Sequence, residues 1–327
     1  MRFAFTEEQI ALRDGFRQAL LRACPPEAVR AAWDGTPGPH WTTLAELGAL
    51  GALLPEEVGG LSLGLLDAVQ LFEAAGEVAV PIPLVDAAAV AGPLLVAGGE
   101  FDLARALAEG SIRFAATRTE RIAYGAAGTV AVRLMGGCAS VLRIEDEPDL
   151  EDVVDQGRPI ARLDWSAAKD LDVSAAEVFG AADRGAVATS AVLVGLGKRL
   201  LDMTVEYVKL RQQFGKPIGA FQAVQHQIVD ALVNIEFAKP LVYRAAHSLD
   251  HRHPEASIHA SMAKAMASDA AYGAAKAALQ CHGAMGYSFE YDLHLWMKRV
   301  WALGRAWGDA HEHRARVADH LNLPKGV

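Results

Sequence analysis

The sequence is poor in cysteine and lacks several common nucleotide and metal motifs. Its 327 residues include only three cysteines, Cys24, Cys138 and Cys281, which form no CxxC pair and no metal-ligand spacing. Isolated cysteines of this kind are typical of a reducing compartment, so a cytoplasmic location is expected. No GxGxxG, P-loop or HExxH motif is present, which argues against a Rossmann dinucleotide site, a P-loop nucleotide site and a zincin.

Positive charge and uninterrupted apolar runs are also scarce. Lysine and arginine total 31 against 40 aspartates and glutamates, so the net charge is −9 and offers no electrostatic footprint for nucleic acid or an anionic membrane. The apolar run 84–99 contains Asp86 and Pro93, and the run 185–197 is too short to span a bilayer. Both are expected to be buried helices rather than membrane spans. The charged segment 1–16 does not resemble a signal peptide.

Helical periodicity fills residues 1–110, which we expect to form an N-terminal helical domain. Thr6, with the residues “EEQ” behind it, is a typical N-cap for the first helix. Residues 42–60 indicate a short helix followed by a Gly- and Pro-rich loop, and residues 62–79 carry an apolar stripe at helical spacing.

Residues 111–180 are expected to form a small β module. Short runs of β-forming residues, “IRFAAT”, “GTVAVRL”, “ASVLRI” and “PIARL”, are separated by glycine, aspartate and proline. The segment 174–177 then leads back into helix.

Residues 181–327 have the pattern of a four-helix bundle. Because the connections are short, we expect antiparallel neighbours, and the helices are predicted over residues 185–210, 219–250, 255–281 and 289–320. The segment 259–280 is rich in small residues that allow close helix approach, and we expect the bundle to carry a subunit interface. The predicted fold is therefore mainly α, with a reduced β module between two helical domains.

The break between the first two bundle helices carries a group of polar side chains. Arg211 offers a planar fork of donors that suits phosphate oxygens, and Gln213 and Gln222 could add amide donors. The Gly-Lys-Pro turn at 215–217 fixes the direction of the next helix, whose N-terminus is itself a site for anions. Taken by itself, the pattern is also explained by a solvated arginine and ordinary loop amides.

A second segment, “QCHGAMGYSFEYDLHLWMKR”, joins the next two helices. Gly283 and Gly286 permit close backbone approach, or they end a helix as ordinary C-caps. The nearby His282 and His294 have no partners at metal-ligand spacing, so no metal site is expected.

Four segments together resemble the acyl-CoA dehydrogenase family, and the resemblance covers most of the chain. “FTEEQIALRDGFR” is similar to the family's opening helix, and “LAELGALGALLPEEVGG” is similar to its GxxGxxxPEExGG loop. “LRQQFGKPIGAFQAVQHQIVD” resembles its RxxFGxxIxxxQxxxxxxAD signature, and “QCHGAMGYSFEYDLHLWMKR” resembles its QxxGGxGYxxExxxxRxxRD signature. Four motifs in the same order make the resemblance highly specific.

The resemblance implies FAD as the cofactor and residues of this chain as part of its site. Arg211 would pair with the FAD diphosphate, Phe214 would pack against the cofactor, and Gln222 would contact it near the ribityl or diphosphate region. The adenosine end would be lined by Gln280, Gly283 and Ala284. In this family these residues reach the flavin of a neighbouring subunit.

The sequence departs from the family pattern where the catalytic base is expected. The family reaction removes hydrogen from Cα and Cβ of an acyl thioester, and a carboxylate takes the α-proton. Trp307 stands where most members carry this glutamate, and Gly185 stands nearest the alternative position in the long helix. Asp183 and Asp309 are the candidates for a substitute base, although an N-cap role would also explain Asp183.

The middle module is also shorter than in the family. No TEPxxGSD-like segment, whose backbone and hydroxyls hold the flavin ring, appears between residues 111 and 180. The resemblance therefore implies the reduced, non-catalytic subunit of a heteromeric, α2β2 enzyme, such as those of actinobacterial steroid degradation. A second acyl-CoA dehydrogenase subunit would supply the base and most of the acyl-CoA site, and Trp307 is expected to fill or close the cavity of this chain.

Two other interpretations stay open. The chain could be a self-sufficient homo-oligomeric acyl-CoA dehydrogenase with a divergent base, or a flavin-free scaffold of the same fold. In an active enzyme, we expect an electron-transfer flavoprotein or a similar protein to accept the electrons.

Overall fold

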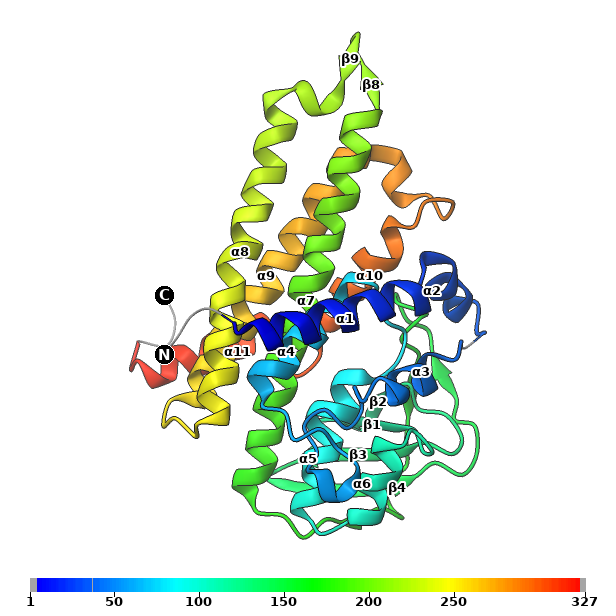
Figure 1. The fold of residues 1–327 in the computed structure, drawn as a ribbon, viewed down its shortest axis with the longest axis vertical. Coiled ribbons are helices and arrows are strands. Elements are labelled where there is room, and N and C mark those ends of the chain that lie inside the picture. Colours follow the sequence, from blue (N-terminus) through cyan, green and yellow to red (C-terminus); the bar gives the residue numbers. More distant parts are fainter. Residues whose placement is uncertain (1–4, 37, 324–327) are drawn as a thin grey trace.

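The computed structural model describes residues 5–36 and 38–323 (Figure 1). The N-terminal helices are α1 (Glu7–Ala23), α2 (Pro26–Trp33), α3 (His40–Glu46), η1 (Glu56–Val58), α4 (Leu65–Glu77), the π-helix η2 (Val85–Ala91), α5 (Gly92–Ala97) and α6 (Phe101–Ala108). α1 begins at the expected cap, because the Thr6 hydroxyl accepts from the Gln9 amide and the Gln9 side chain accepts from the Thr6 amide. The apolar run that begins at residue 84 forms η2 and α5, which are largely buried.

The β module lies where the sequence predicts it. Its strands are β1 (Phe114–Thr117), β2 (Arg121–Ala123), β3 (Val130–Met135), β4 (Cys138–Arg143), β5 (Leu150–Glu151), β6 (Ile160–Arg162) and β7 (Lys169–Asp170). One sheet has the order β1-β3-β4-β7, with β1 parallel to β3, and a second antiparallel sheet has the order β2-β6-β5. The module lies beside α5 and α6 at the lower end of the molecule in Figure 1.

The C-terminal helices form the long bundle that rises above the β module in Figure 1. They are α7 (Ala175–Leu210), α8 (Gln222–Asp250), α9 (Ala256–His282), α10 (Leu293–Arg305) and α11 (Ala310–His320). α7 starts six residues before the domain boundary that we placed at 181, behind a capping box of Ser174 and Glu177. α7 is long and apolar enough to cross a membrane, but 78% of its apolar window is buried, as in the core helix of a bundle.

The expected fourth helix, 289–320, is wrong as a single element. α10 ends at Arg305 and α11 starts at Ala310, and between them Trp307 and Gly308 have φ angles of 59° and 94°. A tryptophan in the left-handed region is uncommon and costs about 1–2 kcal/mol, so other contacts must hold the turn. The small residues of α9 allow close helix approach, as expected. They are largely buried within the chain, where α9 packs against α7 and α8, and so do not themselves form an exposed interface.

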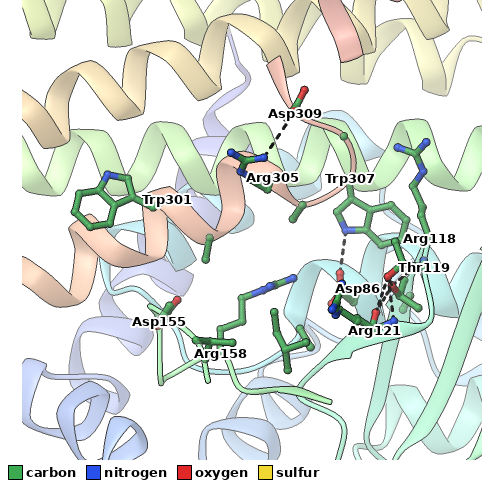
Figure 2. Close-up of a pocket in the computed structure, with 18 of the residues that line it drawn as sticks. Asp86, Arg118, Thr119, Arg121, Asp155, Arg158, Trp301, Arg305, Trp307 and Asp309 are labelled. Atoms are coloured by element: carbon green, nitrogen blue, oxygen red, sulfur yellow. Dashed lines mark hydrogen bonds and ion pairs between the residues drawn. The ribbon is translucent and has the colours of Figure 1, made fainter. Parts of the chain in front are cut away.

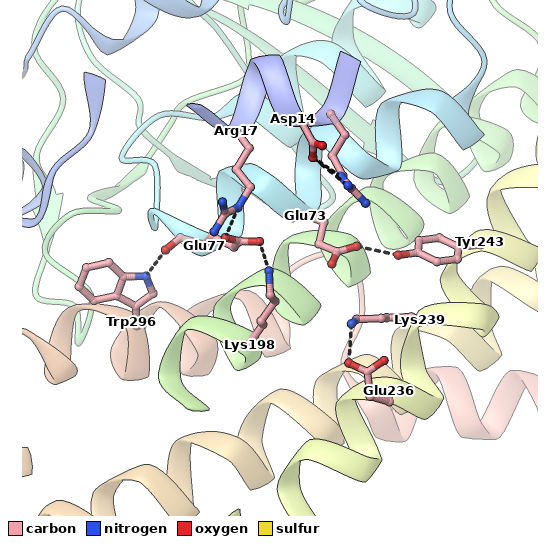
Figure 3. A network of polar contacts seen from close by, with 10 residues as sticks. Asp14, Arg17, Glu73, Glu77, Lys198, Glu236, Lys239, Tyr243 and Trp296 are labelled. Carbon is pink, nitrogen blue, oxygen red and sulfur yellow. Dashed lines mark hydrogen bonds and ion pairs between the residues drawn. The ribbon is translucent and has the colours of Figure 1, made fainter. Parts of the chain in front are cut away.

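α4 crosses α7 at a pair of glycines. A Cβ on Gly76 would lie 2.1 Å from the Val192 oxygen, and one on Gly195 would lie 1.9 Å from the Glu73 oxygen, so both positions require glycine. Figure 3 shows the polar network beside this crossing. Buried Glu77 accepts hydrogen bonds from Arg17 Nε and Lys198 Nζ, each at 2.6 Å, which compensates its charge and ties α1, α4 and α7 together.

Candidate functional site

The end of the bundle farthest from the β module carries the predicted cofactor residues (Figure 1). α7 ends at Leu210, and the chain then forms a hairpin of β8 (Gln212–Gln213) and β9 (Lys216–Pro217), followed by η3 (Ile218–Ala220) and α8. Arg211 is anchored by its backbone, whose carbonyl accepts from Ile218 N at 2.8 Å. Its side chain is exposed and has no ion pair or hydrogen bond within the described chain. Phe214, at the hairpin tip, is 92% exposed.

The second group of predicted residues lies at the same end. The ring of Tyr207, one turn before Arg211, stacks on His282 with centroids 4.2 Å apart. Gln280 and Ala284 on either side of His282 are exposed. Gly283 has φ 59° and ψ −136°, a conformation open to glycine alone, so its peptide is presented in a fixed direction. The structure thus gathers the two segments that the sequence separates by about seventy residues.

The arrangement suits a large anionic ligand that approaches from outside the chain. α8 begins behind Phe221, which supplies no side-chain cap, so the first amides of the helix are available to an acceptor. Gln222, the first residue of α8, is exposed as well. An unpaired guanidinium, free helix amides and nearby carboxamides form a donor set that matches phosphate oxygens.

A cavity of about 840 Å³ opens at the opposite part of the molecule, between the β module and the α10–α11 turn (Figure 2). One wall comes from the segment after β1 and the loop before β6, and the other comes from α10 and the start of α11. The expectation that Trp307 fills this space is therefore wrong. Trp307 forms one edge of the cavity and leaves the rest open.

Trp307 is fixed by contacts on three sides. Its Nε1 donates to Asp86 Oδ1 at 2.9 Å, as Figure 2 shows. Its ring lies against Gly185, where a Cβ would be only 2.6 Å from Cδ2. Its carbonyl accepts from His313 Nε2 at 2.9 Å. A carboxylate in place of this ring would lose the contacts with Asp86 and Gly185, while the carbonyl contact depends on the backbone alone.

A buried lysine supports the same turn from behind. Lys264, in α9, is completely buried, and its Nζ donates to the carbonyls of Gly304 and Gly308 and to Ser268 Oγ, at 2.9–3.0 Å. Burial lowers the pKa of this lysine to about 7. The two carbonyl acceptors, of Gly304 and Gly308, tie the left-handed backbone between α10 and α11 to α9.

The two candidate bases are poorly placed for proton abstraction. Asp183 lies inside α7 rather than at its N-cap, so the capping interpretation is wrong; the cap is Ser174. The Asp183 carboxylate is 8% exposed, pairs with Arg316 Nη2 at 3.1 Å and does not line the cavity. Asp309 does line the cavity, but it caps α11, and the hydrogen bond from Glu312 N holds its pKa below the usual value.

Asp86 and Arg158 are cavity residues that sequence reasoning did not identify. Asp86 appeared only as a charge that interrupts an apolar run, and Arg158 stood in a loop without a motif. Burial raises the pKa of Asp86 to about 6, although the charge of Arg158 opposes this effect. A lone charged residue inside an otherwise apolar helix was the signal that could have identified Asp86.

One group of possible metal ligands lies near the turn between α8 and α9. Ligand atoms of His253, Glu255 and His259 come within 4.8 Å of one another. The guanidinium of Arg244 lies 3.5 Å from His259 Nε2, and its positive charge would repel a cation bound to that nitrogen. We therefore assign no metal to this group.

Comparison with known proteins decides the family. Residues 6–109 match the model of the acyl-CoA dehydrogenase N-terminal domain, and residues 178–321 match that of the C-terminal domain. The chain belongs to the acyl-CoA dehydrogenase family. The two matched regions leave the β module between them.

Relatives of similar length support the assignment. Acyl-CoA dehydrogenase IpdE2 of Mycobacterium tuberculosis is 32% identical over 301 residues, which is 90% of this chain and 91% of that protein. IpdE2 of Mycolicibacterium smegmatis is 30% identical over 95% of this chain and 98% of that protein. Among solved structures, the ChsE4-ChsE5 complex from Mycobacterium tuberculosis matches with a TM-score of 0.82 at 20% identity and full coverage of both chains. At that identity the structural match shows the acyl-CoA dehydrogenase fold alone.

Proposed function

We propose that this chain is the non-catalytic subunit of a heteromeric, FAD-dependent acyl-CoA dehydrogenase, and that it completes the flavin site of a catalytic partner subunit. The observation that carries the proposal is the contrast between the two ends of α7. At one end, the side chains of Arg211, Gln222 and Gln280 are exposed and have no hydrogen-bond or ion-pair partner among the described residues. At the other end, Trp307 stands where the family resemblance places the base, and three contacts hold it there.

The residues at the bundle end fit FAD supplied by a neighbour. Arg211 would pair with the diphosphate, Gln222 and the free amides of α8 would add donors, and Gln280, Gly283 and Ala284 would line the adenosine end. FAD, when bound, supplies the hydride acceptor for α,β-dehydrogenation. Gly185 and Arg211 lie about 39 Å apart along α7, at about 1.5 Å per residue, so these donors lie far from the chain's own cavity.

The chain's own cavity offers little to a flavin ring. Thr117 and Thr119, in the segment after β1, donate their hydroxyl hydrogens to the Arg121 carbonyl, at 2.6 and 3.0 Å. These hydroxyls are therefore occupied within the loop. Because these hydroxyls are not available to a flavin ring, they support one flavin site shared with the partner rather than a separate flavin site in each subunit.

An exposed apolar stripe on α8 supports the partner subunit. Val229, Leu232, Val233 and Phe237 follow helical spacing, and each is between 43% and 64% exposed. Apolar side chains aligned on a long helix next to a half-site indicate a protein interface. We assign this stripe to the interface with the catalytic acyl-CoA dehydrogenase subunit. That the ChsE4-ChsE5 structure is a complex of two named components agrees with such an assembly.

One observation favours a second candidate, a self-sufficient dehydrogenase. The cavity is open, and the Asp86 carboxylate in it has a pKa raised to about 6, near the range that suits a general base. Against this role, Asp86 is 6% exposed and its Oδ1 already accepts the Trp307 indole hydrogen.

The decisive experiment is flavin stoichiometry. The chain is purified alone and together with the acyl-CoA dehydrogenase chain encoded beside it, and bound FAD is measured by absorbance and by protein mass. We expect one FAD per heterodimer and little flavin on the chain alone. A yellow, active species that consists of this chain only would replace the proposal by the self-sufficient enzyme. A complex that contains no flavin would instead support the third interpretation, a flavin-free scaffold of the same fold.

A further inference from the structure

We propose that the indole ring of Trp307 is a gate between the large cavity and a smaller pocket in the interior of the chain. The gate is closed in the structure, and it opens transiently when the ring swings into the large cavity. The proposal concerns the access of water to the interior, so it does not depend on which subunit holds the flavin.

The smaller pocket lies behind Trp307. Its volume of about 40 Å³ is well above the minimum of about 10–15 Å³ that one water molecule requires. Four residues line both this inner pocket and the large cavity: Asp86, Arg158, Ala306 and Trp307. The two spaces therefore share one wall, and Trp307 is part of it.

The inner pocket is lined by a residue whose polar atom has no partner. Thr189 is 1% exposed, and its Oγ1 forms no hydrogen bond within the described chain. Thr189 lies one turn after Gly185 on α7, so it belongs to the helix face against which the Trp307 ring packs. Because a buried hydroxyl is rarely left unpaired, we expect the inner pocket to hold water.

One hydrogen bond and one packing contact hold the ring in the shared wall. Trp307 Nε1 donates to Asp86 Oδ1 at 2.9 Å, as Figure 2 shows, and the ring lies against Gly185. Nε1 is the only atom of an indole ring that donates a hydrogen bond. The large cavity, with a volume of about 840 Å³, offers the space into which the ring can turn once this bond breaks.

The backbone on the Trp307 side of the gate is fixed. Lys264 Nζ donates to the Gly308 carbonyl at 2.9 Å, and His313 Nε2 donates to the Trp307 carbonyl at 2.9 Å. Opening is therefore a rotation of the Trp307 side chain and not a movement of the turn.

The Asp86 side of the gate is fixed as well. Asp86 belongs to η2, in which the Ala89 carbonyl accepts from Arg184 Nε at 3.1 Å. Pro93, four residues after Ala89, has no N–H and cannot form the α-helical bond to this carbonyl. Arg184 thus ties η2 to α7 at the point where the proline interrupts the helical hydrogen bonds.

Labelling of a cysteine in the inner pocket measures the opening of the gate. The Thr189→Cys variant is treated with methyl methanethiosulfonate, and mass spectrometry of its peptides compares the introduced thiol with exposed Cys138 and buried Cys24 in the same sample. We expect the introduced thiol to react much more slowly than Cys138 but about tenfold or more faster than Cys24, because local opening is more frequent than global unfolding. Low concentrations of urea should not change its rate.

Two results of this labelling would overturn the gate. If the introduced thiol had the same rate and the same urea dependence as Cys24, the inner pocket would open only when the whole chain unfolds. If it reacted as fast as Cys138, the wall would not be closed. Val192→Cys, at a buried position that lines the same pocket, takes the place of Thr189→Cys if the latter does not fold.

Variants of the wall identify the gating residue. Trp307→Phe, combined with the cysteine reporter, removes the donor to Asp86 and keeps an aromatic ring, so labelling should become about tenfold to a hundredfold faster relative to Cys24. Trp301→Phe is the matched control, because Trp301 lines the large cavity but its Nε1 has no partner within the described chain. An unchanged rate in Trp307→Phe, or an equal acceleration in both variants, would contradict the proposal.

Discussion

Trp307 lies directly against Gly185, and these residues occupy the two positions at which the acyl-CoA dehydrogenase resemblance places a catalytic carboxylate. A Cβ at Gly185 would lie 2.6 Å from Trp307 Cδ2, a distance that real side chains do not show. The glycine therefore makes room for the indole. The absence of a carboxylate at one position is therefore structurally linked to its absence at the other.

This packing predicts that Gly185→Ala destabilises the chain. In a helix interior, alanine stabilises the folded chain by about 1 kcal/mol relative to glycine. Overpacking against a fixed ring, however, destabilises it by about 1–3 kcal/mol. Gly180→Ala, in the same helix with only a flexible arginine end nearby, is the matched control and should be neutral or stabilising. Urea unfolding of the two variants makes the comparison. Equal stabilisation by both would show that Trp307 moves freely.

Local sequence patterns predicted most of the elements. The Thr6 cap, the strands of the β module and the long bundle helices follow from capping, alternation and apolar periodicity, which depend on neighbouring residues. The helix break at Trp307 could not be predicted from local patterns. It depends on Lys264, which is distant in the sequence, and on His313, which comes after the turn. The cavity also escaped prediction, since Asp86 and Trp307 are 221 residues apart.

The sequence predicted individual cofactor residues but not how their helices pack. Their polarity and the turn between helices identified Arg211 and Gln280 as noteworthy, and the structure places both at one exposed end. The sequence did not show against which helices α9 packs, because small residues allow close approach equally within one chain and between chains. Only the packing of α7 and α8 on α9 distinguishes the two.

Replacement of Arg211 by lysine should weaken FAD retention in the assembled complex. Lysine keeps the charge but cannot donate two parallel hydrogen bonds to a diphosphate. A charge-assisted hydrogen bond is worth about 1.5–3 kcal/mol, so we expect affinity to fall by about tenfold to a hundredfold, measured by flavin fluorescence on titration of the apo-complex. Arg143→Lys, in the β module, serves as the control. An unchanged affinity in Arg211→Lys would remove this residue from the flavin site.

The α8 stripe predicts a specific effect on assembly. Val233→Asp combined with Phe237→Asp places two charges in an interface core, which should lower partner affinity by about a hundredfold or more. Size-exclusion chromatography of the co-expressed chains measures the effect. Phe101→Asp changes an aromatic residue that is 52% exposed on α6, and should leave assembly intact. If Phe101→Asp disrupted the complex and the double variant did not, the interface would lie outside the α8 stripe.

Stability should depend on pH through His313. This residue is fully buried, and burial lowers its pKa to about 4. Between about pH 6.5 and 4 the unfolded chain binds a proton that the folded chain does not, so the contribution of the neutral ring is complete above pH 6.5 and is lost as the pH falls. At about 1.4 kcal/mol per pH unit, the loss is on the order of 3 kcal/mol.

His313→Gln should therefore remove part of this pH dependence. The difference in unfolding free energy between the unaltered chain and the variant should shrink from pH 7 to pH 4.5. Urea titrations at several pH values measure it, and His226→Gln, at an exposed position of α8, is the control. A constant difference would show that His313 is protonated in the folded chain.

We predict that the catalytic base lies on the partner subunit and not on this chain. Asp309→Asn should leave turnover of the complex within a few-fold of the unaltered enzyme, because asparagine keeps the cap of α11 and the proposed proton acceptor lies on the partner subunit. Asp183→Asn removes an ion pair with Arg316 and should lower stability, while turnover per folded complex stays similar. Glutamine in place of the catalytic glutamate of the partner subunit should abolish turnover.

Asp86→Asn is the discriminating variant, since Asp86 is the buried carboxylate of the open cavity. If it alone removed activity while FAD content and assembly stayed intact, this chain would be catalytic and the self-sufficient enzyme would replace the heteromeric proposal.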